Sequence, residues 1–213
     1  MESESATLLF FVSMLLTMYS VGFFFLGEKP SYVKAISFVL ACIGMYLVFS
    51  FSIVAFAFLA ALMAILNGIA SGGEISFSKK LSGSYSTLYI TWLSWIAIAL
   101  TNAPISIFLG EAQLLPSFDL VWLWQLGYTV ASMLAFWLII EGLKYVEAGI
   151  GGLLGLLEII FSIVFGIFLF GEELSSKVII GGCLILVAAA LPHLSLLMVR
   201  MGKGRETGVS RLG

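Results

Sequence analysis

Residues 149–170 read GIGGLLGLLEIIFSIVFGIFLF, an apolar run with a single charged residue, Glu158, near its middle. A run of about 20 residues spans the hydrocarbon core of a bilayer as a helix. The rest of the chain is similar, because 61% of its 213 residues are hydrophobic, 10% are charged and the mean hydropathy is +1.14. A soluble domain is about 45–50% apolar and about 25% charged. The sequence therefore predicts a chain whose solvent is lipid.

The length of the apolar runs decides between the two folds that can cross a bilayer. Only helices and closed barrels satisfy their backbone hydrogen bonds in lipid, and barrel strands alternate in polarity over ~10 residues. The runs here last about 20 residues, so we predict an all-α membrane protein with about seven transmembrane helices. The predicted helices are 6–26, 33–51, 53–77, 87–109, 119–142, 149–170 and 177–199, followed by a disordered basic tail.

The distribution of Lys and Arg predicts the orientation. Of the ten basic residues, nine fall on one side of the predicted membrane and Lys177 alone falls on the other. The nine are Lys29, Lys34, Lys79, Lys80, Lys144, Arg200, Lys203, Arg205 and Arg211. Because positive residues collect on the cytoplasmic side, we expect a multi-pass protein of the cell (plasma or inner) membrane. Its C-terminus would be cytoplasmic and its N-terminus outside.

A short turn occurs twice and suggests an internal repeat. Gly27-Glu28 with Ser31 recurs as Gly171-Glu172 with Ser175, at an offset of 171 − 27 = 144 residues. The two turns follow the first and the sixth predicted helices, which are five crossings apart and therefore oppositely oriented. Inverted repeats of this kind are typical of secondary transporters. The offset also predicts that three helices of a first repeat are missing before Met1.

Glu158 is the strongest candidate for a functional residue. A charged carboxylate at mid-membrane costs about 2.5–3.5 kcal/mol on insertion scales, and such residues usually face a bundle interior or a water-filled path. Helical spacing places Gly155, Glu158 and Ser162 on one face. We predict that Glu158 binds substrate or a proton. The alternative is a protonated glutamic acid that only hydrogen-bonds a neighbouring helix.

Polar residues at helical spacing on three other helices predict a shared cavity. They are Ser13 and Thr17 on the first helix, Asn67, Ser71 and Glu74 on the third, and Gln125 and Thr129 on the fifth. Ser and Thr in membrane helices often bond only to their own backbone, so helix packing is the alternative. The second and seventh helices lack such stripes and are predicted to be peripheral, facing lipid or a partner subunit.

The sequence offers little for catalysis or for large partners. The only histidine, His193, has no metal-ligand partner at useful spacing, and no nucleophile motif or phosphate-binding loop occurs. We therefore predict no enzyme activity, no catalytic residue, no metal and no cofactor. No basic patch suits nucleic acid, so the expected partners are a small-molecule solute and the lipid bilayer. A homodimer, or a partner that supplies the missing helices, is a further expectation.

Four segments resemble a known family. FWLIIEGLKYVEA at 136–148, Leu156-Leu157-Glu158 and GEELS at 171–175 resemble the end of an EamA domain, and GEKPS at 27–31 resembles the same turn in a preceding domain. The chain resembles helices four to ten of a ten-helix EamA-type permease of the drug/metabolite transporter superfamily. On this resemblance, residues 1–52 are the last two helices of a first repeat, 53–199 are a complete second repeat, and 200–213 are a cytoplasmic tail.

The resemblance also implies a function. Members of this family move small metabolites, amino acids and drugs by alternating access around a central cavity, which the first, third, fifth and sixth helices here would line. Many relatives carry Pro after the mid-membrane Glu, where this chain has Ile159, so an unkinked sixth helix is expected. We predict a secondary transporter, with proton coupling through Glu158 as one option. The alternative is a non-transporting or truncated membrane subunit; an intramembrane enzyme is disfavoured.

Overall fold

A computed structural model describes residues 2–49, 58–112 and 116–209, and within these ranges the chain is helical and contains no strand. Its helices are α1 (Glu2–Phe25), α2 (Tyr32–Phe49), α3 (Phe58–Leu81), α4 (Thr87–Phe108), α5 (Leu120–Leu143), α6 (Ala148–Gly155), α7 (Leu157–Phe170) and α8 (Ser176–Val209). Helices α6 and α7 form one span, so seven stretches of the described chain are long and apolar enough to cross a membrane. The prediction of about seven transmembrane helices is confirmed. Residues 50–57 of the predicted second and third helices lie outside the described ranges.

The chain divides into two compact units. The first, which we call the main bundle, comprises Met1–Ser76 and Glu147–Gly213, and the second, the hairpin unit, comprises Phe77–Val146. The main bundle contains α1, α2, most of α3, and α6 to α8. The hairpin unit contains the end of α3 with α4 and α5.

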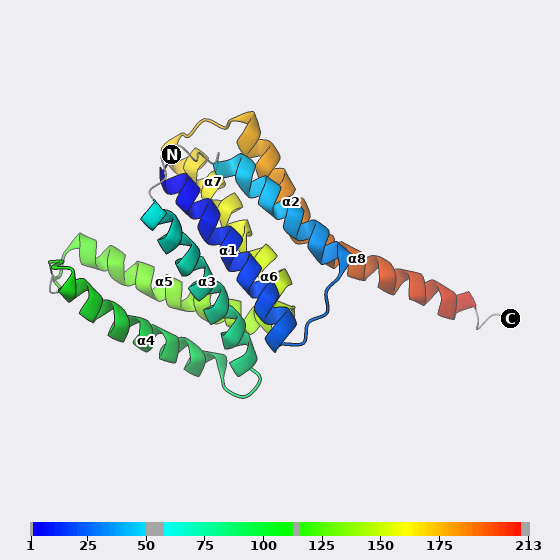
Figure 1. Ribbon diagram of the computed structural model, residues 1–213, viewed down its shortest axis with the longest axis horizontal. Helices are drawn as coiled ribbons and strands as arrows, with labels where there is room; N and C mark the ends of the chain where they lie inside the picture. The colour runs from blue at the N-terminus through cyan, green and yellow to red at the C-terminus, as the bar shows by residue number, and fades with distance from the viewer. Residues whose placement is uncertain (1, 50–57, 113–115, 210–213) are drawn as a thin grey trace. The chain divides into compact units, whose positions relative to one another are not determined.

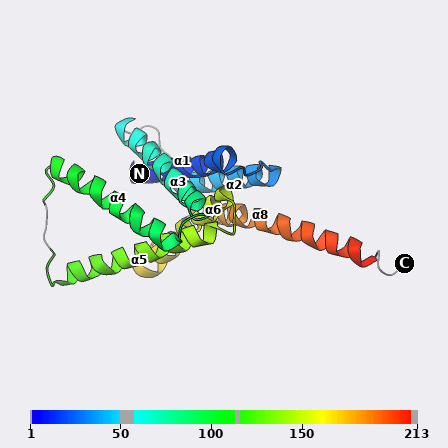
Figure 2. The same ribbon diagram turned by 90° about the horizontal axis from the view of Figure 1, so that it is seen from below.

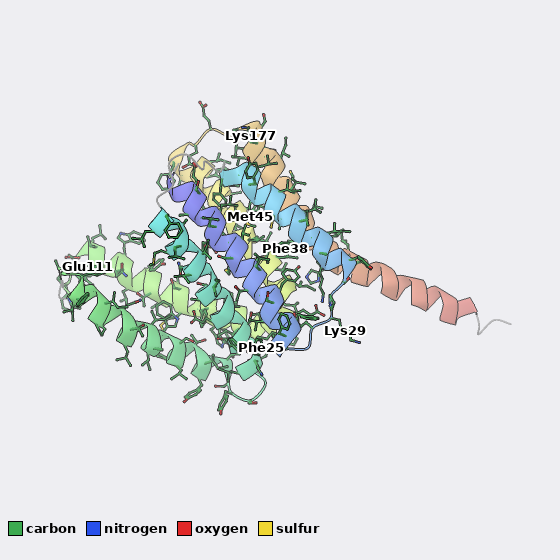
Figure 3. The ribbon with its side chains drawn as sticks, viewed as in Figure 1. Phe25, Lys29, Phe38, Met45, Glu111 and Lys177 are labelled. Atoms are coloured by element: carbon green, nitrogen blue, oxygen red, sulfur yellow. The ribbon has the colours of Figure 1, made fainter. Side chains whose placement is uncertain are left out.

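The core of the main bundle lies where segments distant in sequence meet. Helix α1 packs against α6, and α2 runs alongside α8 (Figures 1 and 2). The largest fully buried apolar side chains of the bundle are Leu15, Met18, Met45, Leu153, Leu156 and Ile185, of which Met45 is labelled in Figure 3. Many large apolar side chains point outward instead, such as Phe168 at 81% exposure. This arrangement fits a bundle whose outer surface is covered by lipid.

Helices α2 and α8 approach closely along a contact that we call the glycine seam, Gly44 and Gly181. A Cβ built on Gly44 would lie 2.7 Å from the Gly181 carbonyl oxygen, and one on Gly181 would lie 2.6 Å from the Gly44 oxygen. Small residues let membrane helices bring their backbones together. The second and seventh predicted helices therefore do more than face lipid, because one face of each packs on the other.

Helix α3 meets α1 through a second pair of glycines. A Cβ on Gly68 would overlap the Phe10 carbonyl oxygen and the Ser13 hydroxyl, and one on Gly72 would lie 2.9 Å from Cβ of Thr17. Because the side chain of glycine is a single hydrogen atom, Gly68 and Gly72 let α3 lie directly against this face of α1. Close packing of this kind depends on glycine at both positions.

The hairpin unit is held by polar contacts near one end of α4 and α5. The Thr87 hydroxyl donates to the Glu141 carboxylate at 2.7 Å and accepts from the Trp137 indole N–H at 3.1 Å, while Lys144 Nζ lies 2.8 Å from the same carboxylate. At the start of α5 the Asp119 carboxylate accepts from the Trp122 N–H at 2.9 Å as a helix N-cap. Hydrogen bonds from Ser117 and Trp122 lower the pKa of Asp119 below its ordinary value.

The two Gly-Glu turns have the same local geometry. Gly27 and Gly171 end their helices in the left-handed conformation, with φ of 69° and 67°, where a residue without Cβ is favoured. In each turn the glutamate N–H donates to the carbonyl of a glycine six residues earlier, Glu28 to Gly22 at 2.9 Å and Glu172 to Gly166 at 3.3 Å. Figure 3 places Lys29, next to the first turn, and Lys177, after the second, at opposite ends of the main bundle.

The C-terminal segment differs from the prediction. Helix α8 continues as far as Val209 and extends beyond the other helices of the main bundle (Figure 1), whereas a disordered tail was predicted from Arg200. The physical reason is that Arg200-Met201, Lys203 and Arg205-Glu206 are good helix formers with no proline among them. Gly202 and Gly204 weaken this segment without ending it.

Candidate solute-binding groove

The helical span that carries Glu158 is interrupted near its middle. Helix α6 ends at Gly155 and α7 begins at Leu157. The Leu156 N–H is shared between the carbonyls of Gly152 and Leu153, both at 3.3 Å, and the Ile159 N–H donates to Leu156 at 3.0 Å, three residues back instead of four. The α-helical hydrogen-bond ladder is therefore irregular at Leu156, although the backbone there stays in the right-handed helical region, with φ of −63° and ψ of −12°.

The cause of the break is local sequence, and its result is the position of Glu158. Glycine costs about 1 kcal/mol relative to alanine in a helix interior, and Gly151, Gly152 and Gly155 precede the break, which therefore needs no proline. Glu158 consequently lies in the first turn of α7, where the positive end of the helix dipole favours a negative charge. Interrupted helices that expose backbone and charge are typical of transporter binding sites.

A groove of about 600 Å³ opens in the main bundle beside Glu158. Its other polar side chains are Thr7 of α1, Ser162 of α7 and Glu172 of the α7–α8 turn. Its apolar wall comprises Phe11, Val48, Phe49, Ile159, Ile163, Phe165, Gly166 and Phe170. The described lining thus holds two carboxylates and no basic side chain, in surroundings that are mostly aliphatic or aromatic.

The carboxylates of Glu158 and Glu172 are both exposed to this groove. Within the described ranges no hydrogen bond or ion pair joins either carboxylate to another residue. A carboxylate in an apolar groove is stabilised by water, by a proton or by a positively charged or hydrogen-bonding ligand. The chemistry of this lining therefore suits a small solute that carries both an apolar part and a positive or hydrogen-bonding group.

Of the residues predicted to line a cavity, Glu158 and Ser162 lie together in this groove. Gly155 is exposed one turn before them, and a Cβ there would meet nothing within 4 Å. Ser13 and Thr17 lie instead in the contact between α1 and α3. Their hydroxyls donate to the carbonyls of Leu9 at 2.6 Å and of Ser13 at 2.8 Å, respectively.

The remaining predicted residues are distributed over both units. Asn67 is exposed, and Ser71 and Glu74 are half-buried, on the part of α3 that belongs to the main bundle. Gln125 and Thr129 line a separate groove of about 730 Å³ at the start of α5, in the hairpin unit. That groove also contains Trp122 and Asp119.

Sequence reasoning missed most of the groove lining, including Thr7, Phe11 and Glu172. The sequence indicates Glu172 only as part of a turn. The repetition of the Gly-Glu pair could have identified this carboxylate as a candidate site residue. Thr7 lies near the end of its helix, where a hydroxyl side chain does not by itself indicate a binding site. Phe11 is one of 18 phenylalanines in the chain. Neither residue type nor spacing distinguishes these two.

Comparison with known proteins gives the family. The model of the EamA-like transporter family matches residues 58–192. The chain belongs to this family. This EamA-like chain is 27% identical over 173 residues to an uncharacterized transporter of Archaeoglobus fulgidus, an alignment that covers 78% of the chain and 58% of that protein. It is 31% identical over 116 residues to an uncharacterized transporter of Haemophilus influenzae, covering 54% of the chain and 68% of that protein. The chain thus spans little more than half the length of the archaeal relative.

Proposed function

We propose that the chain is a secondary transporter that moves a small organic solute across the cell membrane by alternating access. The observation that carries this proposal is the groove, in which Glu158 stands at a break in a membrane helix and faces an apolar wall. Family membership and the printed names of the two relatives support it. Glu158 would bind the solute or the coupled proton, with Ser162 and Gly155 beside it, and we expect no catalytic chemistry.

The other residues that the sequence predicts to line a cavity are also part of the proposal. Asn67, Ser71 and Glu74 on α3, and Gln125 and Thr129 on α5, would line the solute path at stages of the transport cycle. Ser13 and Thr17 would contribute where α3 separates from α1. The architecture proposed with them is an inverted repeat, in which 1–52 end a first five-helix unit and 53–199 form the second. The common geometry of the two Gly-Glu turns supports this division.

The proposal is tested by reconstituting the purified chain in proteoliposomes. Candidate solutes, taken from amino acids, organic cations, nucleosides and organic phosphates, are added with and without a pH gradient. We expect at least one class to be taken up in exchange for internal solute or to move protons with it. A correctly inserted chain that moves no member of any class would favour the alternative, a non-transporting membrane subunit.

The orientation yields a separate prediction. With Cys42 and Cys183 replaced by alanine, a Ser82→Cys variant should be protected from an impermeant maleimide in intact cells and labelled after permeabilisation. The reason is the nine-to-one distribution of Lys and Arg, from which we expect the connection between α3 and α4 to be cytoplasmic. The matched control is Ser117→Cys, in the next connection, which should be labelled in intact cells. External labelling at Ser82 would reverse the proposed topology.

A further inference from the structure

The glutamates of the two Gly-Glu turns fold back over their own helices, but among the described residues only one of them has a hydrogen-bonding partner. The Oε2 atom of Glu172 lies 2.5 Å from where a Cβ on Gly166 would stand. Glu28 covers Gly22 at the same distance, and its Oε1 caps α6 by accepting from the Ala148 N–H at 2.6 Å. The Glu172 carboxylate makes no hydrogen bond or ion pair with another described residue, and it lines the solute-binding groove.

The position of the Glu172 side chain fixes the distance between the two carboxylates of the groove. Because this carboxylate lies beside Gly166, it stands 166 − 158 = 8 residues along α7 from Glu158. A helix rises about 1.5 Å per residue, so the two carboxylates are separated by roughly 12 Å along the helix axis. Positions 158, 162 and 166 follow one another at four-residue spacing on one face of α7, and all three line the groove. The two negative charges therefore border the same side of the groove.

A hydroxyl group stands midway between the two carboxylates. Ser162 lies four residues from Glu158 and four from Gly166, and it is exposed to the groove. Serine and threonine hydroxyls in membrane helices commonly donate to a carbonyl of their own helix, as those of Ser13 and Thr17 do here. Within the described ranges the Ser162 hydroxyl makes no such bond. It is therefore available to accept a hydrogen bond from a ligand in the groove.

The rest of the groove lining suits a chain of methylene groups that carries positive charge. Its aromatic wall comes from three helices and comprises Phe11, Phe49, Phe165 and Phe170. The faces of aromatic rings attract cations, and apolar surface favours contact with methylene groups. The described lining contains no basic side chain, and residues 50–57, which lie outside the described ranges, include no charged residue in the sequence. Neither part of the chain therefore supplies a positive charge to neutralise the two carboxylates.

We propose that the groove binds a linear aliphatic polyamine, whose terminal ammonium groups pair with Glu158 and Glu172 and whose methylene chain lies along the aromatic wall. Single bonds of about 1.5 Å advance an extended zigzag chain by roughly 1.25 Å each, so nitrogens about nine bonds apart span the distance between the carboxylates. A secondary ammonium near the middle of such a chain donates to the Ser162 hydroxyl. This inference rests on the proposed function and deepens it, because it names the class of solute.

The test measures equilibrium binding to the full chain in nanodiscs of phosphatidylcholine, whose headgroup has no net charge, with empty nanodiscs as the blank. Octanediamine, whose nitrogens have the required separation, is compared with aminooctanol, in which a hydroxyl group replaces one ammonium group of a chain of the same length. The diamine should bind roughly ten- to a hundredfold more tightly, the size of one charge-assisted hydrogen bond. Butanediamine is too short to reach both carboxylates, so it should bind no more tightly than the amino alcohol.

Two variants and a matched control separate a bridging site from general charge attraction. Glu172→Gln and Glu158→Gln keep the shape of the side chain, and each should reduce the affinity for octanediamine to that for aminooctanol. Retained binding of the amino alcohol shows that the variant is folded. Glu173→Gln removes the neighbouring carboxylate of the same turn, which is not part of the described lining, and should preserve the preference for the diamine. A parent chain without this preference, or a preference that survives Glu172→Gln, would overturn the proposal.

The polyamine site and the proposed transport can fail separately, because the binding measurement needs no movement of solute. Tight binding of octanediamine without uptake of any solute in proteoliposomes would support the polyamine site and contradict the proposed transport. Uptake of another class of solute by a chain that does not prefer the diamine would support transport and overturn this inference.

Discussion

Replacing Glu158 with glutamine is expected to abolish uptake of the solute or its dependence on the pH gradient, while membrane insertion stays normal. Glutamine keeps the shape of the side chain and can still accept a hydrogen bond, but it carries no charge and cannot release a proton. A hydrogen bond to a charged group contributes about 1.5–3 kcal/mol, which is roughly ten- to a hundredfold in affinity. The measurement is uptake in proteoliposomes as a function of external and internal pH.

Two further variants define what the Glu158 result means. Glu158→Leu removes the charge and the hydrogen bonds, so it should insert at least as well as the parent but transport nothing. Ser162→Ala changes another polar group of the same groove and should lower the affinity for solute while leaving the pH profile in place. If transport and pH profile were unchanged in both Glu158 variants, the carboxylate would be a packing residue and the proposed role would be lost.

The second large effect is expected at the contact between α1 and α3. A methyl group at Gly68 would collide with the Phe10 carbonyl oxygen, a backbone atom that cannot turn aside as a side chain can. Gly68→Ala should therefore separate the two helices and destabilise the protein by about 1–3 kcal/mol. The measurement is thermal unfolding in detergent, where roughly 2–4 °C is expected for each kcal/mol in a chain of this size.

Gly73 provides the matched control on the same helix. A Cβ at Gly73 meets nothing within 4 Å, so Gly73→Ala should be neutral or should stabilise α3 by up to about 1 kcal/mol through its higher helix propensity. Equal melting temperatures for the two variants would show that α3 does not depend on its close approach to α1. Opposite shifts would show that the glycine at position 68 is required for packing and not for flexibility.

The parts of the fold that follow from average hydrophobicity could be predicted from sequence. The length of each apolar run predicts the seven spans and most of their ends, because the bilayer thickness fixes how long a membrane helix must be. The turns at Gly27 and Gly171 were recognisable because a left-handed residue that ends a helix is commonly glycine. The two turns share their backbone geometry, with φ of 69° at Gly27 and 67° at Gly171.

Features that depend on three-dimensional neighbours were beyond sequence reasoning. Ser13 and Glu158 both stand on helical polar stripes, but α3 covers the first and a groove exposes the second. The break at Leu156 was missed because three glycines weaken the helix without proline. The capping of α6 by Glu28 joins residues 120 positions apart, and no local pattern indicates such a bond.

The glycine seam has a consequence for how the protein is made. Gly44 and Gly181 are separated by 181 − 44 = 137 residues, so at 5–20 residues per second the ribosome needs roughly 7–27 s to deliver the partner of α2. Throughout that interval the face of α2 that carries Gly44 is available to lipid or to the α2 of another nascent chain. A nascent chain whose synthesis stops before α8 would keep that surface bare. The tight contact between α2 and α8 can therefore form only after α8 has been synthesised.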